Sequence, residues 1–171
     1  MSNTEKMLEI KDLSVIYKTD LETVYAVNDV SFSLEKGATL GLVGETGAGK
    51  TTLALTLMSL LPEHTGKVTA GSVTFEGQNV VELPEAQMRK IRGDKIAMIF
   101  QDPMTSLNPT MKVGKQIEEM LKEHCKEMSK ADRKARAIEL LSLVGISNPE
   151  ERYKQYPHQL SGGQRQRIGI A

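Results

Sequence analysis

The chain has 171 residues, of which 26% are charged and 39% hydrophobic, and its formal net charge is zero. This is the composition of an ordinary globular protein with enough chain for one sizeable core, and the balanced charge argues against a nucleic-acid-binding tail or a basic membrane-binding patch. No apolar run approaches the roughly 20 residues that span a bilayer, so at a membrane a partner would have to hold this chain. The single cysteine, Cys125, excludes an internal disulfide.

The first part of the chain is predicted to consist mainly of strands. Residues 8–17 and 24–34 alternate between apolar and polar side chains, which is typical of strands with one buried face. Residues 38–43 form a short apolar run, which is typical of a strand buried on both sides. A glycine-rich loop follows, and residues 51–61 then predict a helix that ends at Pro62.

Shorter elements are predicted between this helix and residue 100. Residues 72–75 and 79–81 indicate a small hairpin around Glu76-Gly77. Residues 85–91 predict a short helix, and residues 95–100 predict a second strand buried on both sides.

The rest of the chain is predicted to be helical. Residues 113–126 and 129–144 both show helical periodicity, and Ser129 followed by Asp132 resembles a capping box. The buried face of the second helix is expected to hold Ala131, Ala135, Ile138, Leu141 and Val144. The predicted regions are therefore a core at 1–109, a helical region at 110–160 and the start of a further helix at 161–171.

The glycine-rich loop fits the pattern G-x-x-x-x-G-K-[ST]. This P-loop segment comprises Gly44, Glu45, Thr46, Gly47, Ala48, Gly49, Lys50, Thr51 and, directly after the pattern, Thr52. Glycines let backbone N–H groups surround phosphate oxygens, and the following helix directs its N-terminal N–H groups at the same anion. Lys50 can reach the β- and γ-phosphates, and the Thr51 hydroxyl can bind Mg²⁺. The sequence therefore predicts a nucleotide-phosphate site between a strand and a helix.

A second glycine-containing segment lies far downstream. This signature segment comprises Leu160, Ser161, Gly162, Gly163 and Gln164. Read by itself, it predicts a turn in which Ser161 caps a helix that starts at the glycines. A serine hydroxyl and free N–H groups at a helix start also form an anion site.

The two segments, in this order, resemble the ATPases of ABC transporters, because GETGAGKTT is similar to their Walker A loop and LSGGQ to their signature motif. The resemblance implies an α/β P-loop NTPase core with an antiparallel β subdomain and an inserted helical subdomain. It implies that Lys50 is catalytic, together with Gln101, the Q-loop glutamine, which would contact Mg²⁺ or the attacking water. It also implies that Tyr17 stacks on adenine, with Tyr25 as the alternative.

Two longer stretches, 100–111 (FQDPMTSLNPTM) and 156–167 (YPHQLSGGQRQR), resemble the oligopeptide and dipeptide importer branch, which also includes nickel importers. That resemblance implies ATP and Mg²⁺ as cofactors and peptide uptake driven from the cytoplasmic face of the cell membrane. The implied partners are a second ATPase subunit, identical or different, two membrane-spanning permease subunits and, indirectly, an extracytoplasmic solute-binding protein. No nucleic acid is implied. In such a dimer the signature segment contacts the γ-phosphate of the partner's ATP.

In this family the Walker B strand, its catalytic glutamate and a switch histidine follow the signature helix, within which Ala171 lies. We therefore expect a chain truncated after the signature motif, with the C-terminal part of the fold missing and negligible ATP hydrolysis of its own. One alternative is a catalytically inactive nucleotide-binding module. A second is a non-transport ABC ATPase, which the short spacing between the two motifs disfavours.

Overall fold

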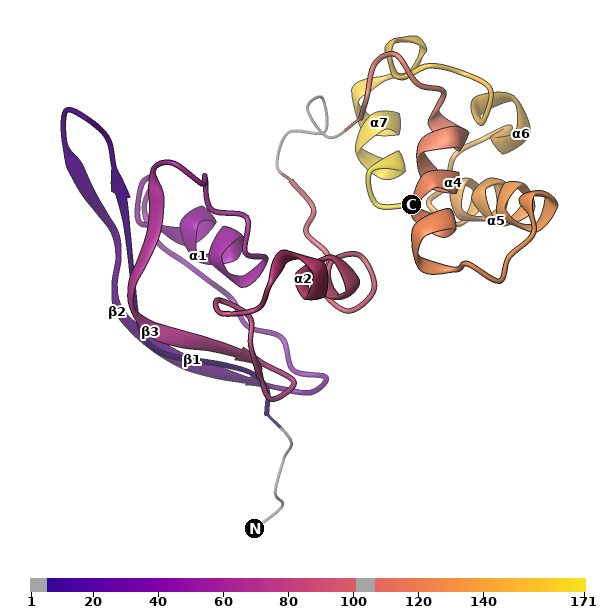
Figure 1. The fold of residues 1–171 in the computed structure, drawn as a ribbon. Helices are drawn as coiled ribbons and strands as arrows, with labels where there is room; N and C mark the ends of the chain where they lie inside the picture. Colours follow the sequence, from indigo (N-terminus) through magenta and orange to yellow (C-terminus); the bar gives the residue numbers. More distant parts are fainter. Residues whose placement is uncertain (1–5, 101–106) are drawn as a thin grey trace. The chain divides into compact units, whose positions relative to one another are not determined.

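The computed structural model describes residues 6–100 and 107–171, and the chain folds as two units that separate between Ile96 and Ala97 (Figure 1). The predicted ranges drew the core boundary after residue 109, whereas Leu107 already packs against the core of the second unit. The predicted last region, 161–171, shares that core, because Ile168 is buried in it.

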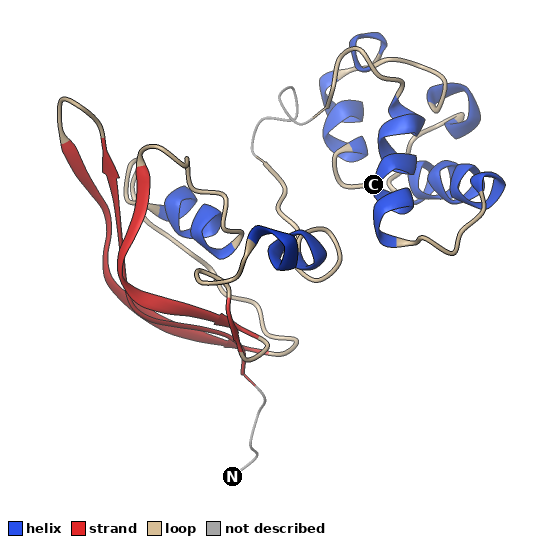
Figure 2. Ribbon diagram, in the orientation of Figure 1, coloured by secondary structure: helices blue, strands red, loops and turns tan. Residues whose placement is uncertain are grey.

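The first unit is built on an antiparallel sheet, shown in red in Figure 2. Its strands are β1 (Lys6–Lys18), β2 (Thr23–Glu35), β3 (Gly66–Phe75) and β4 (Gln78–Asn79), and the order in the sheet is β2-β1-β3-β4. Ile10 of β1 lies opposite Phe32 of β2 and Val73 of β3, so apolar side chains gather on one face. The predicted antiparallel subdomain is confirmed.

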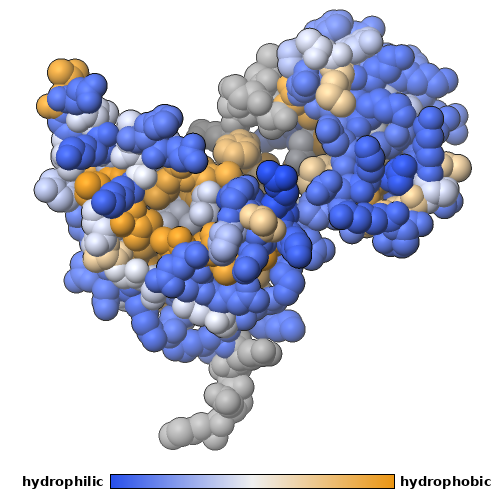
Figure 3. Space-filling model, viewed as in Figure 1, coloured by the Kyte–Doolittle hydropathy of each residue, from blue (hydrophilic) through white to orange (hydrophobic). Residues whose placement is uncertain are grey.

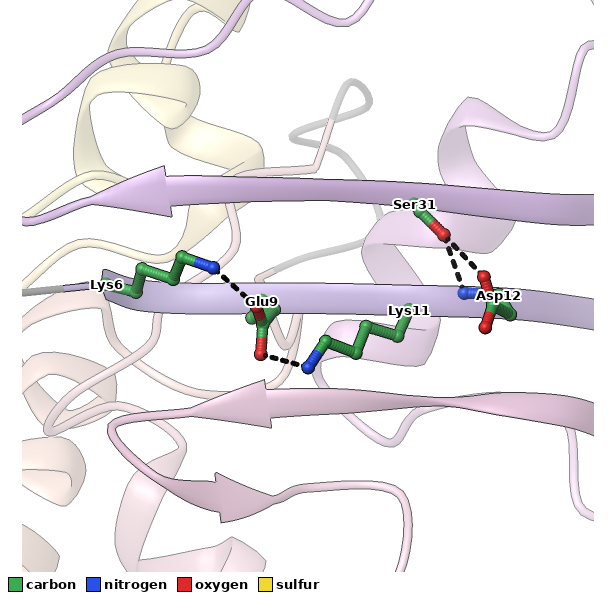
Figure 4. A network of polar contacts seen from close by, with 5 residues as sticks. All are labelled: Lys6, Glu9, Lys11, Asp12 and Ser31. Atoms are coloured by element: carbon green, nitrogen blue, oxygen red, sulfur yellow. Dashed lines mark hydrogen bonds and ion pairs between the residues drawn. The ribbon is translucent and has the colours of Figure 1, made fainter.

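A bulge in β1 keeps this apolar face continuous. The buried residues Ile10 and Leu13 are three positions apart, so an extra residue must be inserted for both to face the core. Asp12 supplies it with a φ of 48°, and its N–H donates to the Ser31 hydroxyl over 2.8 Å while that hydroxyl donates to the Asp12 carboxylate over 3.0 Å (Figure 4). In the same view, Glu9 accepts from lysines on both sides of it in β1.

Two helices cover the apolar face of this sheet. They are α1 (Lys50–Leu57) and α2 (Glu85–Ile91), and Leu53, Met88 and Ile91 lie in one core cluster with the buried residues of β1 and β3. The predicted helix over 51–61 therefore ends earlier than expected, and Ser59 has a φ of 51°, outside the helical region.

The two strands predicted to be buried on both sides do not form. Residues 38–43 and 97–100 have no regular secondary structure, and they have no strand partner among the described residues. Val43 is 94% exposed and Ile99 is 63% exposed, so the prediction of buried strands at 38–43 and 95–100 is wrong for this structure. An apolar run becomes a buried strand only where other strands flank it. Apolar surface on the first unit is visible in orange in Figure 3.

The second unit is helical. Its elements are α4 (Val113–His124), α5 (Lys130–Leu143), α6 (Pro149–Arg152), the short 3₁₀ helix η1 (Pro157–Gln159) and α7 (Gly162–Ile168). Ser129 caps α5 by accepting from the Asp132 N–H over 3.2 Å, as predicted. The predicted helical subdomain is thus confirmed. None of the described helices has the length and apolar character that a membrane crossing requires.

The buried face of α5 differs from the predicted one. Leu141 is fully buried as expected, and Ile138 and Val144 pack against the same core, but Ala131 and Ala135 are exposed and Ala137 is buried instead. An alanine gains little free energy from burial, so the position of the larger leucine and isoleucine side chains decides how the helix is rotated.

Candidate functional site

The P-loop segment contains one glycine that the fold requires. Gly49 is the N-cap residue of α1 with a φ of 79°, a conformation that glycine adopts without strain. A Cβ at this position would overlap the backbone carbonyl of Ala26 in β2. The start of α1 is therefore held close against β2, and its N-terminal N–H groups are presented by a fixed part of the sheet.

The Lys50 side chain is the centre of the loop. Its ammonium donates to the backbone carbonyls of Gly44 and Glu45, both at 2.6 Å, so the loop encloses the charged group. The Ala48 N–H donates to the Glu45 carbonyl over 3.2 Å and closes a turn inside the loop. This arrangement places a cation and the positive end of a helix together, which is how proteins bind phosphate groups.

The other residues of the P-loop segment divide into exposed and buried positions. Residues 44–48 and Thr51 are exposed, whereas Thr52 is 8% exposed and belongs to the first unit's interior. The Thr51 hydroxyl is thus placed where a ligand can reach it, on the first turn of α1 beside Lys50. A hydroxyl there suits Mg²⁺, which takes oxygen ligands.

A cavity of about 280 Å³ lies between the P-loop segment and β2. Its lining is aliphatic on one side, with Val27, Val30, Leu42, Val43 and Leu53, and includes Gly49 and Lys50 of the P-loop segment on the other. The aliphatic side of the cavity does not suit a phosphate group. The cavity is instead space beside the extended segment 38–43, where the predicted strand does not form.

The two tyrosines predicted as adenine-stacking candidates differ in exposure. Tyr17 is half-buried near the end of β1, opposite Val24 of β2 and Gly66 of β3. Tyr25 of β2 is 70% exposed. The adenine-stacking role of Tyr17, with Tyr25 as the alternative, stays a prediction. Gln101 lies outside the described residues.

The signature segment forms the predicted helix start. Ser161 is the N-cap of α7, and its hydroxyl oxygen accepts from the Gln164 N–H over 3.3 Å. The Gln164 side-chain carbonyl in turn accepts from the Ser161 N–H over 2.9 Å, which completes a capping box. Because the serine oxygen is the acceptor in this bond, its O–H proton remains available to donate to an anion. Leu160 anchors the segment, since it is 5% exposed in the core of the second unit.

The two glycines of this segment have no conformational need to be glycine. Gly162 and Gly163 do not have positive φ values, and no heavy atom among the described residues lies within 4 Å of a Cβ built on either one. Their lack of a side chain leaves open space in front of the first N–H groups of α7. Space of this kind allows an anion to approach the backbone closely.

Two polar clusters were not found by sequence reasoning. Arg92, after α2, donates to the carbonyls of Met58 and Ser59 at the end of α1 over 2.7 and 2.8 Å. In the second unit the residue Glu118 is 8% exposed, and its carboxylate accepts from the Tyr153 hydroxyl. The available signal for the second cluster was an acid at helical spacing from the apolar face of α4. Among residues 6–100 and 107–171, no three His, Cys, Asp or Glu side chains gather in a way that suits a metal ion.

Similarity to known proteins agrees with both segments. Residues 27–171 match the ABC transporter family. The chain is 51% identical over 171 residues to the oligopeptide transport ATP-binding protein OppD of Bacillus subtilis (strain 168), covering 100% of this chain and 48% of that protein. It is 52% identical over 167 residues to the dipeptide transport ATP-binding protein DppD of Lactococcus lactis subsp. cremoris (strain MG1363), covering 98% of this chain and 48% of that protein. The chain thus spans about half the length of these curated relatives.

Comparison with solved structures also identifies an ATP-binding cassette. The fold matches the ATP-binding cassette MJ0796, solved as a dimer in a post-hydrolysis state with ADP and Pi, with a TM-score of 0.82 and 30% identity. That match covers 96% of this chain and 67% of the other. The predicted resemblance is confirmed in sequence and in fold, and the chain belongs to the ABC transporter family.

Proposed function

We propose that this chain is the N-terminal portion of the ATP-binding subunit of an ABC importer that takes up oligopeptides or dipeptides. The observation that carries the proposal is the loop closed around the Lys50 ammonium at the N-terminus of α1. On binding ATP, this ammonium exchanges the Gly44 and Glu45 carbonyls for oxygens of the β- and γ-phosphates. The names of the curated relatives, which are peptide transport proteins, favour this class of cargo.

We assign the remaining groups of this site from the family's pattern, on the residues of this chain that match it. Backbone N–H groups of residues 47–52 bind the phosphates, and the exposed Thr51 hydroxyl binds Mg²⁺ together with Gln101. The metal supplies charge neutralisation at the β- and γ-phosphates when it is bound. Tyr17 stacks on the adenine base.

The signature segment acts on a second nucleotide. In a dimer of two ATPase subunits, the Ser161 hydroxyl and the open N–H groups beside Gly162 and Gly163 contact the γ-phosphate held by the partner's P-loop. The capping box supports this role, because it fixes the serine while leaving its proton free to donate. The dimer then sits at the cytoplasmic face of the membrane on two permease subunits, which an extracytoplasmic solute-binding protein supplies with cargo.

The chain of 171 residues has two proposed properties of its own. It binds nucleotide, and it hydrolyses ATP negligibly, so that it behaves as an inactive binding module. In the complete subunit a later strand pairs with the exposed apolar segment 38–43, in the family's arrangement. A turnover of about 1 s⁻¹ or more by this chain, within the usual range of enzymes, would contradict the second property.

Calorimetric titration of the chain with ATP, with and without Mg²⁺, tests the proposal. Saturable binding is expected, and Lys50→Ala should weaken it by roughly tenfold or more, because a charged donor to the phosphates is lost. Lys90→Ala, at an exposed position on α2, is the matched control and should leave the affinity unchanged. Equal affinities for the two variants would show that the P-loop segment is not the nucleotide site.

A further inference from the structure

A buried carboxylate in the second unit lies between α4 and the segment that follows α6. Glu118 of α4 is 8% exposed, and charged side chains are rarely buried to this extent unless they are paired. Its two partners are the Tyr153 hydroxyl, which donates to one carboxylate oxygen, and the Lys115 ammonium, which lies 2.7 Å from the other. Tyr153 is itself 6% exposed and belongs to the core. The pair therefore joins α4 to the segment that follows α6.

Backbone hydrogen bonds join the same two parts of the chain. The first N–H groups of a helix have no partner within the helix. In α4 the Val113 N–H donates to the Gln155 carbonyl over 2.9 Å, and the Gly114 N–H donates to the Tyr153 carbonyl over 3.0 Å. The segment 153–155 thus takes the place of a capping side chain at the start of α4.

The contact is also close in space. A Cβ on Gly114 would overlap the Tyr153 ring, so only glycine lets the ring lie against the helix at this point. Two lysine ammonium groups also lie 5.9 Å from the centre of this ring. One belongs to Lys115 of α4 and the other to Lys134 of α5. Tyr153 is therefore contacted from both α4 and α5.

Little freedom remains between Tyr153 and the signature serine. The connecting residues form η1, whose start is closed by a bond from the Tyr156 N–H to the Gln159 side chain over 2.9 Å. Pro157 of η1 is buried, and Leu160 is anchored in the same core cluster as Tyr153. The position of Ser161 therefore follows from the position of Tyr153.

We infer that Tyr153 and Glu118 are positioning residues for the signature segment, which they hold in register with the start of α4. The inference rests on the proposed function, in which Ser161 donates to a phosphate of the partner's nucleotide. A contact between two apolar side chains would stabilise the core as well, but it would not fix one orientation, whereas a hydrogen bond has a preferred direction. Tyr153 and Glu118 act through Ser161 and do not contact the nucleotide themselves.

Amide hydrogen exchange on the 171-residue chain, without nucleotide, tests the positioning directly. The informative probes are the amides of Gln164 and Arg165, whose hydrogen bonds go to the hydroxyl and the carbonyl of Ser161. Tyr153→Phe removes one hydroxyl and should raise their exchange rates about tenfold, while the α5 amides change less than about twofold. Glu118→Gln keeps an oxygen acceptor for Tyr153 and should have a smaller effect than Glu118→Leu. Glu119→Gln, at an exposed neighbour on α4, is the control.

Two exchange results would overturn the inference. In one, exchange rises equally throughout the second unit in Tyr153→Phe and Glu118→Leu, which would mean that the pair only adds stability. In the other, the Gln164 and Arg165 amides do not respond to either variant.

Turnover by the complete ATPase subunit separates this inference from the proposed function. Tyr153→Phe should lower kcat several-fold with little change in KM for ATP, and Ser161→Ala should lower it further. If Ser161→Ala leaves kcat unchanged while the exchange result holds, the proposed function fails and the positioning of the segment stands. If Ser161→Ala lowers kcat and Tyr153→Phe does not, the inference fails and the proposed function stands.

Discussion

Arg92 binds the C-terminal end of α1, the helix that begins with the P-loop residues Lys50 and Thr51. Its guanidinium donates to the carbonyls of Met58 and Ser59, which follow α1, and pairs with Glu85 at 2.7 Å. Arg92→Met keeps most of the aliphatic stem and removes these bonds, so the free energy of unfolding should fall by about 2 kcal/mol. Chemical denaturation measures this change. Arg89→Met, at an exposed position on α2, should change it by less than about 0.5 kcal/mol; equal losses would contradict the account.

Glu118 makes the stability of the second unit depend on pH. Burial raises the pKa of its carboxyl, but hydrogen bonds from Lys115 and Tyr153 and the charge of Arg133 outweigh burial and leave the pKa below its usual value. An unfolded glutamate titrates near about 4.3. The stabilisation is therefore complete above about pH 5 and is lost as the pH falls through the lower pKa of the folded state.

The expected result is a difference in how steeply the free energy of unfolding changes with pH. Urea unfolding of the second unit should show wild type losing stability more steeply than Glu118→Gln between about pH 5 and 3, so that the two converge in acid. Glu119→Gln should follow wild type across this range. Parallel curves for wild type and Glu118→Gln would show that the buried carboxylate is not stabilised by its partners.

At the scale of the element, a glycine of α7 is expected to matter for ligand binding and not for folding. A Cβ on Gly163 meets no described heavy atom within 4 Å, so Gly163→Ala should leave the melting temperature of the chain unchanged or raise the stability by about 1 kcal/mol. The same methyl group fills the space in front of the helix N-terminus. In the complete subunit, Gly163→Ala should therefore lower ATP turnover about tenfold or more, which corresponds to an increase of about 1.4 kcal/mol in the activation free energy.

Gly114→Ala is the matched comparison, because a Cβ there overlaps the Tyr153 ring. It should lower the melting temperature of the chain, in contrast to Gly163→Ala. A loss of stability with Gly163→Ala, or undiminished turnover in the complete subunit, would mean that this glycine serves the fold and not a ligand.

Local features were predictable from sequence at this scale, and features that depend on distant contacts were not. The caps at Ser129 and Ser161 were predicted correctly, because each involves residues three positions apart. Of the buried face predicted for α5, Ala131 and Ala135 are exposed, and Ala137 is buried instead by partners outside this helix. The pairing of Glu118 with Tyr153 spans 35 positions, so no short-range pattern in the sequence links the two residues.

At the scale of the whole molecule, the same distinction explains the two strands that were predicted and not formed. The apolar run at 38–43 carries the composition of a buried strand, but composition does not say which strand will flank it. Among the described residues the sheet is antiparallel throughout, and its order β2-β1-β3-β4 has no place for this run. The consequence is an apolar segment on the surface of the first unit, next to the P-loop segment, with Val43 94% exposed.

Substitution of Val43 measures whether this segment contributes to folding. In the 171-residue chain, Val43→Ser should change the free energy of unfolding by less than about 0.5 kcal/mol, because the side chain is already in water. Leu13→Ala, at a fully buried position in the sheet, should cost about 2–5 kcal/mol and shows that the assay detects a core defect. In the complete subunit, where we propose that a later strand covers the segment, Val43→Ser should cost about 2 kcal/mol. A large cost in the 171-residue chain would show that the segment is already buried there, and a negligible cost in both would show that no strand covers it.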